Sequence, residues 1–186
     1  MHDDPLKTTP LGMIRYAHEF MEAALAVDEK IGSRPGFEIV APIPALYLIG
    51  HSIELSLKAY LLNHGVTLKQ LRNYGHSLHK CIRKAKELGL LNHVQFSTPE
   101  EGAFEILHNL YSTKQLEYIV TGAKQFPVFG LVESFAAKLF NAVSTTIGFD
   151  KQFDSYHFTP MERTTPPDTP AAPQHSPATP TPCLTT

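Results

Sequence analysis

An arginine and a histidine lie four positions apart, across a glycine, in the segment LRNYGHSLH. Arg72 can hold a phosphate in a bidentate manner, and His76 can take up or release a proton near neutral pH. His76 also precedes a predicted helix, and helix N-termini attract phosphate. These parts suffice to cleave RNA without a metal, because a base removes the 2′-hydroxyl proton and a cation stabilises the crowded phosphorane. The alternative is structural, with His76 capping its helix and Arg72 pairing with a carboxylate.

A second set of polar residues forms a narrow stripe on the most apolar predicted helix, residues 44–63. At about 100° per residue, the stripe lies within an arc of roughly 60°. The rest of the helix is apolar, which is typical of a central helix packed on several sides. Because an unpaired buried polar group costs about 1–3 kcal/mol, the stripe is either a thin solvated seam or part of an inward-facing site. Its members are Tyr47, His51, Glu54 and Lys58.

The charges of the chain are segregated. The net charge is only −2, from 16 basic and 18 acidic residues, yet no Asp or Glu occurs from residue 55 to 86. This pattern favours a surface that contacts an anion such as RNA or a nucleotide phosphate. The alternative is that these residues are ordinary solvated helix positions. The basic residues of the segment are Lys58, Lys69, Arg72, Lys80, Arg83, Lys84 and Lys86, and Lys69, His79, Lys80 and Arg83 are the predicted supporting contacts to substrate.

Signatures of other enzyme classes are missing from the sequence. It has no Gly-rich phosphate loop, no GxSxG and no HExxH. Glu105 and His108 form one copy of the Glu-x-x-His motif that di-iron helical bundles use twice. Because the sequence has only this one copy, neither a metal nor a cofactor is predicted. Cys81 and Cys183 make neither a metal cluster nor a disulfide framework, and Cys81 is predicted to be a small buried residue.

The ends and the hydropathy of the chain predict a soluble, cytoplasmic protein that does not contact a membrane. The N-terminus MHDDPLKTTP is polar and acidic, unlike a signal peptide. No apolar run reaches the roughly 18 residues that a membrane span needs. From residue 159 to 186 the chain contains eight Pro and eight Thr, a composition typical of disorder. We therefore expect a flexible N-terminus (1–8), one helical domain (9–150) and a disordered tail (151–186).

Helix signals dominate the domain. Thr9 and Pro10 predict the start of a helix that ends at Gly32. The central helix follows and is closed by Gly65, and residues 66–74 are predicted to be irregular or a single turn.

The second half of the domain carries three more predicted helices. One runs from near His76 to Gly89, and another starts at a capping box that begins with Thr98. Residues 116–120 read either as a strand or as a helix end and loop, and we expect the latter. With a last helix at 128–147, the sequence predicts an all-α antiparallel up-and-down bundle of four or five helices.

The run LYLIGHSIELSLKAYLLNHGV followed by LRNYGHSLHKCIRKAKELGL resembles the HEPN superfamily of small α-helical nucleotide-binding domains. The similarity covers residues 11–147, and its specific part is 46–88. Since the stripe and the Gly-His turn recur together in this pattern, we expect them to meet in space as an inward polar site. The matching residues are Ser52, Glu54, Leu57, Lys58, Ala59, Tyr60, Leu61, Gly65, Gly75, His76 and Leu78.

The resemblance implies a helical bundle that is commonly a homodimer. Many relatives are metal-independent ribonucleases of toxin–antitoxin and other defence systems, whereas others bind nucleotides or mediate assembly. The family's usual motif separates Arg from His by four to six residues; here three residues separate Arg72 from His76. The expectation is an RNA- or nucleotide-binding domain, with His76 as acid/base and Arg72 as phosphate stabiliser if it is an endoribonuclease. An antitoxin is a candidate partner, and the alternative function is a non-catalytic helical binding or assembly module.

Overall fold

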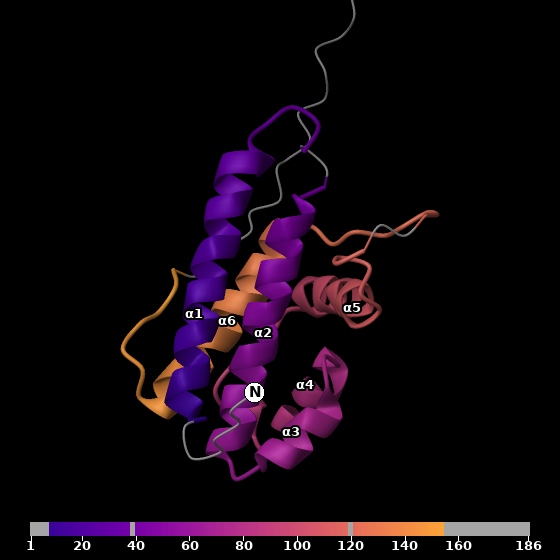
Figure 1. Cartoon of the computed structure of the whole chain (residues 1–186). Helices are drawn as coiled ribbons and strands as arrows, with labels where there is room; N and C mark the ends of the chain where they lie inside the picture. Colours follow the sequence, from indigo (N-terminus) through magenta and orange to yellow (C-terminus); the bar gives the residue numbers. More distant parts are fainter. Residues whose placement is uncertain (1–7, 38–39, 119–120, 155–186) are drawn as a thin grey trace, which may run out of the picture.

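The computed structural model describes residues 8–37, 40–118 and 121–154, and in these residues the chain forms six α-helices and no strand (Figure 1). The all-α fold class is therefore confirmed. The predicted flexible N-terminus up to residue 7, the predicted tail from residue 155 and Cys183 lie outside the described residues. The helices are α1 (Pro10–Val27), α2 (Ile43–Asn63), α3 (Leu68–Tyr74), α4 (Leu78–Glu87), α5 (Thr98–Ser112) and α6 (Phe129–Ile147), with a π-helical turn at Asp28–Gly32 and a 3₁₀ turn at Leu90–Asn92.

Helix α2 is the centre of the domain. It lies side by side with α1 and α6, while α3 and α4 sit beside its C-terminal half and α5 is inclined to it (Figure 1). Twelve of its 21 residues are buried, so the prediction of a central helix packed on several sides is confirmed. Phe135 and Phe140 of α6 and Met21 of α1 are among the largest fully buried side chains around it.

Local capping explains where several helices begin and end. Thr9 Oγ1 accepts a hydrogen bond from the Gly12 N–H at 3.0 Å, which fixes the start of α1 as predicted. After α2 the chain reverses at Gly65, whose φ of +83° is a conformation that favours glycine. The first and central helices were therefore readable from their ends.

The segment 66–74 was predicted wrongly. Instead of an irregular stretch or a single turn, it contains the seven-residue helix α3, which starts from a capping box between Thr67 and Gln70. The Gln70 N–H donates to Thr67 Oγ1 at 3.3 Å, and the Thr67 N–H donates to Gln70 Oε1 at 2.9 Å. This reciprocal pair satisfies two backbone donors. With α3, the described residues hold six α-helices, whereas four or five were predicted.

Two helices begin close to their predicted starts but from different N-cap residues. Helix α4 begins at Leu78 with Ser77 as its N-cap, so His76 lies outside the helix and does not cap it. Helix α5 begins at Thr98 with Ser97 as its N-cap, because the Glu100 carboxylate accepts from the Ser97 N–H at 2.7 Å. Because Ser77 caps α4, the His76 side chain can contact a residue of another helix.

The end of the described chain is bonded to α6. Asn141 Nδ2 donates to the Phe153 carbonyl at 2.7 Å, and the Phe153 N–H donates to Asn141 Oδ1 at 2.8 Å.

The described part of the ambiguous segment after α5, residues 116–118, forms turns rather than a strand. None of the helices described here is long and apolar enough to cross a membrane.

Candidate functional site

A buried carboxylate on α2 gathers side chains from three parts of the chain. The Glu54 side chain is 3% exposed. Its Oε1 accepts from Lys58 Nζ at 2.5 Å, and its Oε2 accepts from the Tyr111 hydroxyl at 2.6 Å. His76 Nδ1 lies 3.0 Å from the same Oε2, and His51 Nδ1 lies 3.7 Å from it. These five residues are called the Glu54 cluster below.

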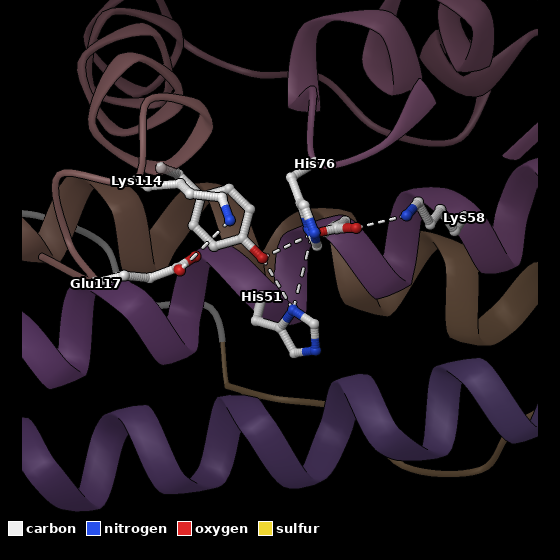
Figure 2. A network of polar contacts seen from close by, with 7 residues as sticks. His51, Lys58, His76, Lys114 and Glu117 are labelled. Atoms are coloured by element: carbon white, nitrogen blue, oxygen red, sulfur yellow. Dashed lines mark hydrogen bonds and ion pairs between the residues drawn. The ribbon is translucent and has the colours of Figure 1, made fainter. Parts of the chain in front are cut away.

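The Glu54 cluster joins the predicted polar stripe to the predicted turn. His51 and Lys58 project from α2. His76 points toward them from the loop that follows α3 and contacts Glu54, which lies between them on α2 (Figure 2). The turn depends on Gly75, whose φ of +58° and ψ of −131° form a backbone conformation open mainly to glycine. The expectation that stripe and turn meet in space is therefore met by the geometry.

The pKa values of the Glu54 carboxyl and the Tyr111 hydroxyl are both shifted from their ordinary values. Burial by itself would raise the pKa of Glu54, but the nearby His51, the hydrogen bonds from Lys58 and Tyr111 and the Lys58 charge outweigh burial and hold the pKa well below its ordinary value. Burial raises the pKa of Tyr111, and the adjacent Glu54 charge and hydrogen bond raise it further. Glu54 is therefore ionised and Tyr111 keeps its proton at neutral pH.

These protonation states decide which imidazole nitrogens carry hydrogen. An ionised carboxylate can only accept, so His76 Nδ1 donates to Glu54. Tyr111 gives its single proton to Glu54, so His51 Nδ1 must donate to the Tyr111 oxygen, 2.9 Å away. The His76 side chain is 61% exposed, which leaves its second nitrogen, Nε2, able to exchange a proton with a ligand.

Tyr111 was not among the residues that the sequence singled out. It lies on α5, 57 positions from Glu54, and nothing in its neighbourhood distinguishes it from an ordinary core aromatic. It is 4% exposed. Only the packing of α5 against α2 brings its hydroxyl to the carboxylate.

The predicted phosphate contacts all lie on exposed faces of α3 and α4. Lys69 and Arg72 are exposed on α3, and Lys80 and Arg83 are exposed on α4. The two α4 residues line a shallow groove of about 630 Å³. The other groove residues include Ser77, His79, Lys86 and His108.

His79 differs from the other predicted contacts because it links two helices. Its Nε2 is hydrogen-bonded to Glu105 of α5, and its ring centroid lies 3.7 Å from that of His108. Among the residues that the structure describes, no group of three or more His, Cys, Asp or Glu side chains could hold a metal ion. The half-motif Glu105–His108 thus contributes to the α4–α5 contact.

Cys81 is buried inside α4, as predicted. Burial raises the pKa of its thiol to about 11. Since the thiolate is the nucleophilic form, this protonated thiol acts as a small core side chain.

Comparisons of the chain with protein-family models, with curated proteins and with solved structures find no match. The residues of the HEPN-like pattern have two kinds of role in the structure. Ser52 donates to the Ala17 carbonyl at 2.7 Å, and Tyr60 donates to the Leu88 carbonyl at 3.1 Å, so both tie helices together. The acidic and basic members of the pattern instead meet in the Glu54 cluster.

Proposed function

We propose that this chain is a HEPN-like helical domain that binds RNA and cleaves it by acid/base chemistry at His76, without a metal ion. The observation that supports this most directly is the contact of His76 Nδ1 with the buried, ionised Glu54 at 3.0 Å. A carboxylate behind one nitrogen of an imidazole orients the ring, fixes its tautomer and stabilises its protonated form. The exposed nitrogen then acts as a base or an acid.

In the proposed reaction, His76 Nε2 takes the proton of a ribose 2′-hydroxyl. The 2′-oxygen forms a bond to the adjacent phosphorus while the bond to the 5′-oxygen breaks. The leaving 5′-oxygen takes a proton from water, and the protonated His76 returns its proton to the solvent. The products are a 2′,3′-cyclic phosphate and a 5′-hydroxyl end. Arg72, four positions before His76, is the proposed stabiliser of the charge on the phosphorane.

The basic residues of α3 and α4 suit a polyanion. Lys69 is exposed on α3, and Lys80 and Arg83 are exposed in the groove on α4, which Glu87 also lines. Cationic side chains of this kind bind phosphates without regard to base identity. A homodimer in an antitoxin-controlled or other defence system is the setting that the HEPN resemblance implies, and it is part of the proposal.

A second candidate is a non-catalytic helical binding or assembly module. Burial of Glu54 at 3% exposure, with donors on both oxygens, favours it. A buried charge needs such donors even in a purely structural role. In this case His76 serves to fasten the α3–α4 segment to α2.

Cleavage of RNA in the presence of EDTA separates the two functions. We expect the wild-type chain to cleave single-stranded RNA and His76→Ala to lose about 10²-fold or more of that rate. His93→Ala is the matched control, since His93 is exposed and lines a different groove. Absence of cleavage by the wild type, or equal rates for wild type and His76→Ala, would leave the non-catalytic module as the function.

A further inference from the structure

A glycine occupies the interior of the most buried helix of the domain. Gly50 lies in the first half of α2 and is itself buried. Glycine costs about 1 kcal/mol relative to alanine at a helix-interior position, so its presence needs a reason. A Cβ at this position would lie 2.8 Å from Tyr111 Cδ2 and 3.2 Å from Tyr111 Cε2. The Tyr111 ring therefore rests on the bare backbone of α2.

In this position the Tyr111 hydroxyl contacts Glu54 Oε2, the oxygen that His76 also contacts. The hydroxyl donates to Glu54 Oε2 at 2.6 Å, and His76 Nδ1 donates to the same oxygen at 3.0 Å. The rings of Tyr111 and His76 are also in edge contact, with centroids 6.3 Å apart. Two donors on one carboxylate oxygen compete for the same negative charge.

We infer that Tyr111, seated against Gly50, is a positioning residue for His76: its hydroxyl holds the shared Glu54 oxygen in place and limits how strongly that oxygen binds the His76 proton. The catalytic meaning of this inference rests on the proposed function. The competition for Glu54 does not, because it follows from the two hydrogen bonds alone.

The other charged and titratable groups around the shared oxygen belong to several elements. On α2, His51 and Lys58 face Glu54. The pKa of Tyr111 is raised mainly by burial and by Glu54. Tyr47 of α2 and Glu117, which follows α5, raise it further. These side chains remain when only the Tyr111 hydroxyl is removed, and His51 is the one among them that loses a hydrogen-bond partner.

The decisive measurement is an NMR titration of the imidazole signals in wild type and variants. In Tyr111→Phe, the ring stays on Gly50 while the competing donor is lost. We expect the midpoint of the His76 titration to move up by about half a pH unit, since the carboxylate charge now acts on His76 with less competition. In Gly50→Ala the new Cβ displaces the ring, and the same upward movement is expected.

Tyr60→Phe is the matched control. It removes the hydroxyl of a buried tyrosine that donates to the Leu88 carbonyl, so it should lower stability without moving the His76 midpoint. An unchanged or lowered midpoint in folded Tyr111→Phe would overturn the inference. Should that variant not fold, Gly50→Ala decides by the same criterion.

RNA cleavage, measured in parallel, keeps the two proposals apart. If the midpoint moves but the wild type does not cleave RNA, the proposed function fails while Tyr111 still positions His76. If His76-dependent cleavage is present and the midpoint does not move, the inference about Tyr111 fails alone. If the wild type cleaves RNA and the His76 midpoint moves, the low-pH limb of the pH–rate profile of Tyr111→Phe should shift to higher pH by the same amount as the His76 midpoint.

Discussion

Among the residues that the structure describes, two glutamates are buried, Glu54 and Glu100, and their surroundings are similar by most measures. Both side chains are at most 4% exposed, and both have a lysine close to one oxygen. For Glu100, burial acts to raise the pKa, but hydrogen bonds from Lys138, Ser134 and Ser97 outweigh burial and lower the pKa to about 2. The pKa of Glu54 is held low in the same way.

The two glutamates differ in the kinds of donor around them. The Glu100 donors are the Ser97 N–H at 2.7 Å, the Ser134 hydroxyl at 2.5 Å and Lys138 Nζ at 2.7 Å. None of these donors is an imidazole. Glu54 instead faces two imidazoles, one of which is well exposed. A buried, ionised carboxylate is therefore not by itself a functional mark, whereas an exposed imidazole held against one is a specific arrangement.

The largest expected difference between the two glutamates is in RNA cleavage. Glu54→Gln removes the charge that orients His76 and stabilises its protonated form, so we expect a loss of about 10²-fold or more. Glu100→Gln should leave the rate unchanged. Cleavage rates in EDTA, with folding checked by circular dichroism, measure this. Equal losses in both variants would mean that cleavage follows stability rather than the Glu54–His76 contact.

Acid unfolding should depend on the ionisation of Glu100. The folded pKa of Glu100 lies below the unfolded value, so its stabilising contribution is present above about pH 4.5 and is lost as the pH falls toward about 2. This contribution is roughly 3 kcal/mol at neutral pH. Glu100→Gln should flatten the pH dependence of the unfolding free energy in that window, measured by urea titration. A curve as steep as that of the wild type would show that Glu100 is not the group that titrates.

The smallest expected effect concerns the groove on α4. Lys80→Ala should weaken binding of single-stranded RNA and reduce the slope of log K against log salt by about 0.7, the loss of one phosphate contact. Fluorescence anisotropy over a range of salt concentrations measures the slope. Lys30→Ala, which removes an exposed charge from the π-helical turn after α1, is the control. The same slope for Lys80→Ala and wild type would remove the groove from the proposed RNA surface.

Much of the helical framework could be predicted from short-range signals. Thr9 with Pro10 and the glycines at 65 and 89 correctly indicated helix ends, because capping depends on residues within one turn. The failures had the same local character. The Thr67–Gln70 box and the N-cap serines 77 and 97 were present in the sequence, but neighbouring residues offered competing caps, and only the folded backbone decided between them.

The candidate site divides in the same way between local and long-range information. By itself the sequence determined that His51, Glu54 and Lys58 share one face of α2, because helical periodicity is a property of adjacent turns. The family resemblance predicted that the stripe meets the turn containing His76, 22 positions from Glu54, but the tertiary structure alone decided that Tyr111, 57 positions from Glu54, joins them. The Gly75 turn and the packing of α5 on Gly50 make those contacts. Helical spacing carries no information about side chains that meet only when helices pack.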